Sequence, residues 1–235
     1  MHTLLLVNKQ SLSADAMKAL QLSLFLWGLI GAIGYSNIHI NQHVDSILQS
    51  SLMPRYLRSG VMYPFTFHVE STFVSNRELR ADFQKGRMVP PEPPLRRLGD
   101  CSSVTEAETR AQQRTAIMCN VSLSDFRAAY KGFTVGEDWH QTNKSIDVEA
   151  TFLDTVVYFE VLYRVGTPAE MVSWRVAPLN AQVAALSREP DLNSERRQRF
   201  DAELKKNLEA AAATFFNGWL YVAIRNAFRF EPPLE

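Results

Sequence analysis

The residues best placed for covalent chemistry are the only two cysteines of this 235-residue chain, Cys101 and Cys119. A reactive thiolate needs an activating neighbour, and no histidine lies near either cysteine in the sequence. In an oxidising compartment we expect the two to form a structural disulfide, which at this loop length contributes about 3 kcal/mol in the chain-entropy model. Two cysteines without a CxxC motif cannot supply a four-ligand zinc site.

Motifs of the common enzyme classes are missing from the sequence. It contains no GxSxG, HExxH, P-loop or GxGxxG pattern. Nothing in the sequence indicates that two carboxylates are buried together, as acid–base catalysis by such a pair would need. His39 and His43 have the spacing of one helix face, but only Gln42 and Asp45 lie near them as further ligands. We therefore predict a protein with no enzymatic activity, no metal site and no cofactor.

Two sequons are candidates for N-linked glycosylation. Asn120-Val121-Ser122 and Asn143-Lys144-Ser145 match the acceptor pattern, which is used only in a secreted chain. Asn143 follows polar residues and is expected to be the better acceptor, whereas Asn120 lies in a strand-like stretch.

Residues 17–36 have the composition of a secretory signal peptide. Lys18 is followed by an apolar stretch of 15 residues, 19–33, and then by small residues near a plausible cleavage point. The stretch is shorter than the roughly 20 residues of a membrane span, although an uncleaved anchor is the alternative. We expect 1–36 to be a signal peptide, with its first 16 residues upstream of the true start, and 37–235 to be one secreted, extracellular domain.

The charge balance argues against a nucleic-acid partner. The chain has 25 basic and 25 acidic residues, and binding a long polyanion needs a basic excess. Hydrophobic residues make up 46% and charged residues 21%, which is typical of a packed globular chain.

Two helices are predicted at the ends of this domain. Residues 38–58 place apolar side chains at helical spacing. A much longer helix is expected from Glu195 to Phe230, with Asn193-Ser194 as its cap. Beyond Thr214 this helix is apolar on nearly every side, so other elements must enclose it.

Alternating apolar and polar residues predict an antiparallel sheet between the helices. The clearest strand spans 146–152, and we expect 157–165 to pair with it across a turn near Asp154. The proline-rich stretch 89–94 is expected to be an extended connector. The other predicted strands share the same two-residue period: 65–73, 79–83, 117–123, 126–130 and 172–176. This order of elements predicts an α+β fold in which a highly curved antiparallel sheet wraps two helices and leaves an apolar seam.

Three segments resemble a family of secreted arthropod proteins found in ticks and mites. They are PLRRLGDCSS (94–103), CNVSLSDFRAAYKG (119–132) and KSIDVEA (144–150). The family includes the mite group-seven allergens and is related to the tubular lipid-binding proteins, with the bactericidal permeability-increasing protein, the juvenile-hormone-binding proteins and takeout. The resemblance covers roughly 38–230 and departs from the family pattern at the prolines of the connector.

The resemblance implies a long and a shorter helix embraced by a bent sheet, and binding of a lipid, lipopeptide or apolar hormone without catalysis. It also implies transient contact with a membrane or lipopeptide. The residues that we predict to line the seam are apolar side chains from both helices and the sheet: Leu48, Phe67, Val69, Val148, Phe159, Trp174, Leu208, Phe215 and Trp219. The alternatives are that these residues fill a closed core and the outer surface engages a protein partner, or that the chain is an enzyme of an unknown type.

Overall fold

The computed structural model describes residues 37–49, 60–72, 77–92, 95–106 and 114–230. The expected signal peptide and the last part of the expected 38–58 helix lie outside these residues. The chain divides into two compact units, Met1–His39 and Ile40–Glu235. The described residues of the first unit, 37–39, are helical, and all the strands belong to the second unit. Among the described residues, no helix has the length and hydropathy needed to cross a membrane.

The described residues form two sheets, and the first has six strands that are antiparallel throughout. Its strand order is β1-β3-β7-β8-β11, and β2 also pairs with β3. The strands are β1 (Val61–Met62), β2 (Phe65–Val69), β3 (Leu79–Val89), β7 (Arg127–Val135), β8 (Lys144–Phe152) and β11 (Ala181–Leu186). β3 ends at Val89, so Pro90 and Pro91 follow the strand instead of interrupting it, as predicted.

The second sheet has five strands among the described residues and is also antiparallel. Its order is β10-β9-β6-β4, and β5 also pairs with β6. The strands are β4 (Arg96–Arg97), β5 (Ser102–Glu106), β6 (Arg114–Ser122), β9 (Val156–Arg164) and β10 (Glu170–Val176).

The predicted α+β fold class is confirmed, but the strands are shared between two sheets instead of forming one. The predicted pairing of 146–152 with 157–165 is wrong: β8 pairs with β7 and β11, whereas β9 pairs with β6 and β10. Asp154 has φ of +50°, and Leu153 N donates to Asn180 O while Leu123 N donates to Thr155 O. The chain therefore changes sheets at this turn instead of folding back as a hairpin.

The helical residues 40–49 pack on the second sheet and its flanking loop. Ile40, Val44, Ile47 and Leu48 recur at helical spacing and are all buried. On the other side, Arg97 of β4 donates from Nε and Nη2 to the two carboxylate oxygens of Asp45, at 3.1 and 3.0 Å. This two-point geometry fixes the helix on β4.

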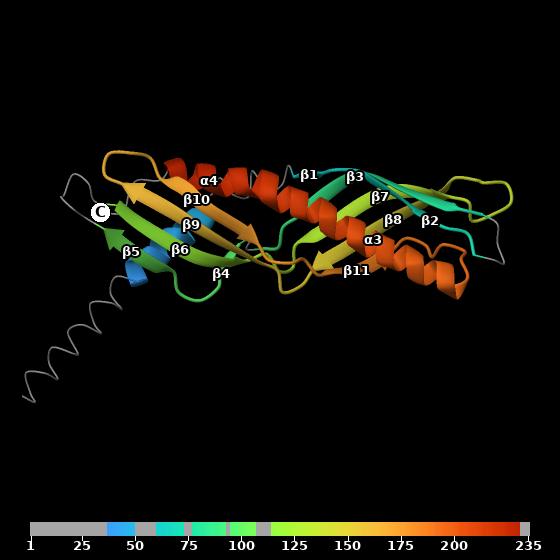
Figure 1. The fold of residues 1–235 in the computed structure, drawn as a ribbon, viewed down its shortest axis with the longest axis horizontal. Helices are drawn as coiled ribbons and strands as arrows, with labels where there is room; N and C mark the ends of the chain where they lie inside the picture. The colour runs from blue at the N-terminus through green and yellow to red at the C-terminus, as the bar shows by residue number, and fades with distance from the viewer. Residues whose placement is uncertain (1–36, 50–59, 73–76, 93–94, 107–113, 231–235) are drawn as a thin grey trace, which may run out of the picture. The chain divides into compact units, whose positions relative to one another are not determined.

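The predicted C-terminal helix is present over its full predicted span, with a π-helical turn inside it. α3 (Ser194–Phe215) is followed by a π-helical turn, η2 (Phe216–Leu220), and by α4 (Tyr221–Phe230). Asn193 caps it, because its side-chain oxygen accepts from Arg196 N at 2.9 Å. α3 contacts β1, β2 and β11 of the first sheet, while η2 and α4 contact β10 of the second (Figure 1). We call α3, η2 and α4 together the helical rod (194–230). The helical rod contacts both sheets, which is why its apolar surface is so extensive.

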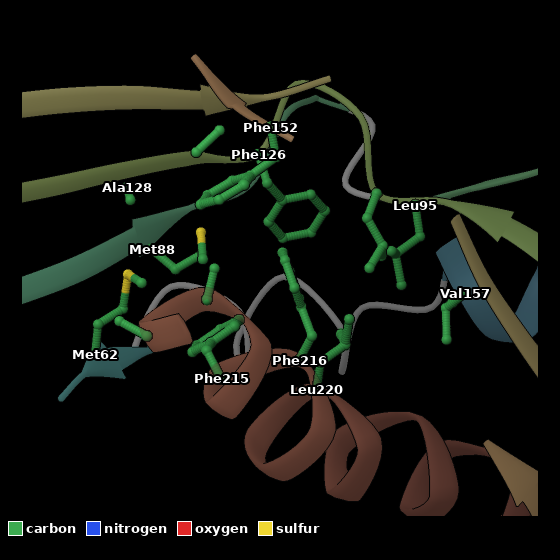
Figure 2. Close-up of a cluster of buried hydrophobic side chains, with 14 of the residues drawn as sticks. Met62, Met88, Leu95, Phe126, Ala128, Phe152, Val157, Phe215, Phe216 and Leu220 are labelled. Atoms are coloured by element: carbon green, nitrogen blue, oxygen red, sulfur yellow. The ribbon is translucent and has the colours of Figure 1, made fainter. Parts of the chain in front are cut away.

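Phe216, the first residue of the π-helical turn, packs where the two sheets meet. Its ring makes edge-to-face contacts with Phe126 and Phe152, with centroids 5.5 and 5.9 Å apart (Figure 2). Phe126 lies in the link between β6 and β7, and Phe152 ends β8. All three rings are fully buried. Edge-to-face pairs of this kind contribute about 0.5–1.5 kcal/mol each beyond area burial, so the junction of helix and sheets is a strong packing centre.

Candidate ligand-binding site

The side chains predicted to line the seam lie inside the fold. Trp174 and Trp219 are half-buried. The others are buried: Leu48, Phe67, Val69, Val148, Phe159, Leu208 and Phe215. The structure therefore places all nine in or at the apolar interior, and their contact with a ligand stays a prediction.

The predicted seam residues form two separate groups, one on each sheet, instead of one continuous lining. On the first sheet, Phe67 of β2 contacts Phe200 of α3, with ring centroids 5.3 Å apart. On the second sheet, Phe159 of β9 contacts Phe228 of α4 at the same 5.3 Å centroid distance. Trp174 belongs to the second group, since it is the cross-strand partner of Phe159. The helical rod is the element that connects the two.

An open pocket of about 260 Å³ lies where β10 meets the helical rod. β10 is the edge strand of the second sheet in the described chain, so its outer side has no further strand to cover it. The pocket is lined by residues of β10, η2 and α4: Met171, Val172, Ser173, Trp174, Asn217 and Tyr221. Of these, the sequence singled out Trp174 alone.

The aromatic wall of this pocket is formed by Trp174 and Tyr221. Their rings are edge-to-face with centroids 5.7 Å apart. The indole Nε1 of Trp174 is buried and has no hydrogen-bond partner among the described residues. A buried donor without an acceptor costs about 1–3 kcal/mol, so an acceptor brought by a ligand would recover free energy here.

The floor of the pocket includes the π-helical turn, which supplies Asn217. π-helical turns are rare and occur frequently at functional sites. On either side of Asn217 in the sequence, the rings of Phe215 and Trp219 stack with centroids 5.4 Å apart. The pocket thus combines apolar and aromatic side chains with two polar residues, Ser173 and Asn217, and the indole N–H of Trp174 is buried beside it. Such a set can bind an apolar molecule that carries a hydrogen-bonding group, and it holds no nucleophile paired with a base.

A charged cluster anchors the chain just before the rod begins. The side chain of Glu137 is 1% exposed and accepts from Nη1 and Nη2 of Arg188, at 2.9 and 2.6 Å. Asp191 N donates to the same carboxylate at 3.0 Å. Burial alone would raise the pKa of Glu137, but the hydrogen bonds from Arg188, Thr134 and Asp191 outweigh burial and lower that pKa. The cluster holds residues 188–191 against the β7–β8 loop and so positions the start of α3.

The predicted disulfide between Cys101 and Cys119 is confirmed. It joins the residue before β5 to β6, and Cys101 N donates to the side-chain oxygen of Asn41 at 3.0 Å. The disulfide therefore fixes the residue before β5 to β6, and the hydrogen bond to Asn41 attaches the same residue to the helical residues 40–49. Asn120 and Asn143, the predicted glycosylation sites, are both exposed, and their occupancy remains a prediction.

Comparison with known proteins agrees with the resemblance to tick proteins. No protein-family model matches the chain. The chain is 24% identical over 193 residues to the salivary anticoagulant protein P23 of Ixodes scapularis, covering 77% of this chain and 83% of that protein.

Two solved structures are similar in arrangement. Lipopolysaccharide-binding protein matches with a TM-score of 0.39 and 13% identity, over 82% of this chain. The chain spans only 39% of the length of that protein. Takeout 1 of Epiphyas postvittana matches with a TM-score of 0.34 and 8% identity, over 82% of this chain and 86% of that one. Because both TM-scores lie below 0.5, nothing about function follows from these two likenesses.

Proposed function

We propose that the protein is a secreted, non-enzymatic binding protein for a lipid or another apolar ligand, held between the C-terminal helical rod and the sheets. The observation that carries this proposal is the open pocket between β10 and η2, which Trp174, Tyr221, Ser173 and Asn217 help to line. Its lining residue Trp174 also has a buried indole N–H without a partner among the described residues. The pocket adjoins the apolar interior, because Trp174 is paired across strands with the buried Phe159.

The energetics suit a ligand with a long apolar part. Each buried methylene contributes about 0.8 kcal/mol, so a dozen contribute about 10 kcal/mol before the ordering costs of binding. The buried side chains already pack on one another, so a ligand that extends inward must displace some of them. Trp174 and Trp219 are half-buried, whereas the other seven predicted seam residues are buried.

The test is uptake of an apolar fluorescent probe that carries a carboxylate. Trp174→Phe keeps an aromatic ring but removes the N–H, and we expect it to weaken binding of this probe by about 2–10-fold, the range for one hydrogen bond. Binding of a purely hydrocarbon probe should change much less. The matched control is Trp139→Phe, because Trp139 is 84% exposed and its ring contacts Arg77 instead of the pocket. Equal binding of the carboxylate probe by Trp174→Phe and the parent protein would contradict the assignment.

The second candidate is a secreted protein-interaction module that modulates a host or an immune response. The similarity to a tick salivary anticoagulant protein favours it, as does the dense packing of most of the predicted seam. In this case the interior is filled and the outer surface binds the partner. Both candidates require export, which residues 17–36 predict and the salivary relative supports.

The probe experiment separates the two candidates. A carrier takes up the probe with saturable stoichiometry, whereas a module with a filled core takes up none. Trp219→Asp adds a charge to the stacked Phe215–Trp219 pair and should abolish uptake by a carrier that remains folded.

A further inference from the structure

A second hollow of about 400 Å³ lies on the other face of the second sheet, away from the helical rod. It is lined by Asn120, Val156, Tyr158, Arg175, Val176 and Ala177. Along β6 and β9 the neighbours of Asn120 and Tyr158, namely Cys119, Val121, Val157 and Phe159, are buried, so Asn120 and Tyr158 face away from the core. The hollow has the size of a small-molecule site.

Three side chains form a row across this face. Asn120 of β6 is the cross-strand partner of Tyr158 of β9, and Tyr158 is the partner of Arg175 of β10. The guanidinium of Arg175 lies over the Tyr158 ring, 5.3 Å from its centroid. Directly opposed residues in an antiparallel pair have Cβ atoms about 5 Å apart, so a group attached to Asn120 starts beside the Tyr158 ring.

Asn120 is also the acceptor position of the sequon Asn120-Val121-Ser122. Its location in a strand does not prevent modification, because the glycan is added to the chain before it folds. What the fold must provide is room for the sugar, and Asn120 is exposed and opens onto the hollow.

We propose that Asn120 carries an N-linked glycan whose first N-acetylglucosamine packs in this hollow against Tyr158. The C–H face of the sugar ring matches the tyrosine ring, the acetyl methyl group matches Val156, and the sugar oxygens accept from Arg175. Asn143 differs, because it is exposed at the end of the loop just before β8, where the next residue, Lys144, is within ion-pair distance of Glu137 and Asp138. The glycan at Asn120 is thus a structural part of the second sheet.

The first test is occupancy. The full chain is secreted from insect cells, treated with peptide-N-glycosidase in ¹⁸O-water, and analysed by peptide mass spectrometry. An ¹⁸O-labelled aspartate at position 120 is the expected result, and an unmodified Asn120 in the secreted protein overturns the proposal.

The second test compares the two sequons in the native protein. If the first sugar lies in the hollow, peptide-N-glycosidase should release the Asn120 glycan from the native protein at least about 10-fold more slowly than it releases a glycan on Asn143. After denaturation the two rates should become equal. Equal rates in the native protein would show that the Asn120 glycan extends freely into solvent and would overturn the packing. If Asn143 is not occupied, native and denatured rates at position 120 are compared directly.

The third test is a double-mutant cycle on the melting temperature. Asn120→Gln should lower Tm by about 2–4 °C, the shift expected for losing one aromatic packing contact in a protein of this size. In a Tyr158→Thr background the same substitution should have almost no effect, whereas Tyr158→Phe should preserve the full effect. Asn143→Gln is the control, and it should change Tm by the same amount in all three Tyr158 backgrounds. An Asn120→Gln effect that does not depend on Tyr158 would contradict the proposal.

Discussion

The indole ring of Trp174 meets the phenol ring of Tyr221 edge-to-face, with 69° between their planes. This contact joins β10, the edge strand of the second sheet, to α4. It also closes one side of the pocket in which Ser173 and Asn217 supply polar groups. The proposed binding function depends on this contact, because it places an aromatic wall and a buried N–H at the place where the interior approaches solvent.

Removing the ring of Phe216 should strongly destabilise the fold. Phe216→Ala leaves a cavity between Phe126 and Phe152, and substitutions of this kind cost about 3–5 kcal/mol. The free energy of unfolding is measured by urea denaturation. Val222→Ala, at a residue on α4 that is 42% exposed, is the matched control and should change stability by less than about 0.5 kcal/mol. Similar losses in both variants would show that the π-helical turn is not the packing centre.

Neutralising Glu137 should destabilise the protein in a pH-dependent way. Glu137→Gln weakens charge-assisted hydrogen bonds from Arg188 and should cost about 2 kcal/mol at pH 7. The pKa of Glu137 is lowered in the folded state, so its contribution is present above the ordinary value of 4.5 and is lost as the pH falls through the folded-state pKa. The difference between parent and variant should therefore shrink in acid.

The control for the Glu137–Arg188 pair is Glu170→Gln. Glu170 pairs with Arg164 on the surface, where both side chains are at least half exposed, so the loss should be at most about 0.5 kcal/mol. A Glu137→Gln difference that stays constant between pH 7 and pH 3 would contradict the assigned ionisation.

Removing the disulfide should lower stability by about 3 kcal/mol. The double variant Cys101→Ala/Cys119→Ala loses a cross-link between residues 18 positions apart, which restores conformational freedom to the unfolded chain. Urea denaturation of parent and variant measures the loss. The parent in reducing agent should match the variant, and an unchanged midpoint in both would contradict a stabilising role.

The long helix could be predicted from the sequence because the signals for it, a cap and a helical period, lie within the helix segment itself. Asn193 supplies a side-chain cap, and the apolar residues after it recur with a single helical period. The π-helical turn at Phe216 was not predicted, since its sequence, FNGWL, fits the same apolar pattern.

Strand pairing could not be predicted in the same way. Alternation shows which side of a strand is buried, but it does not show which strand lies beside it. β8 and β9 both alternate clearly and are separated by a short turn, yet they belong to different sheets. β11 was missed because Ala181 is its one buried residue and the rest of AQVAAL shows no strong alternation.

The candidate site could be predicted only in its apolar part. Trp174 could be predicted because it lies on the apolar side of the predicted strand 172–176. Ser173 and Asn217 are polar residues of ordinary type, and only the packing of β10 against η2 brings them together. The pair of Glu137 and Arg188 is separated by 51 positions, so nothing local in the sequence connects them.

The most direct test of the binding function is the content of the native protein. Protein secreted by its own tissue or by insect cells is washed, extracted with organic solvent, and analysed by mass spectrometry against the protein concentration. A lipid or other apolar molecule at close to one equivalent, absent from an extract of the folded Trp219→Asp variant, is the predicted result. An empty extract from a protein that also takes up no apolar probe would contradict the account.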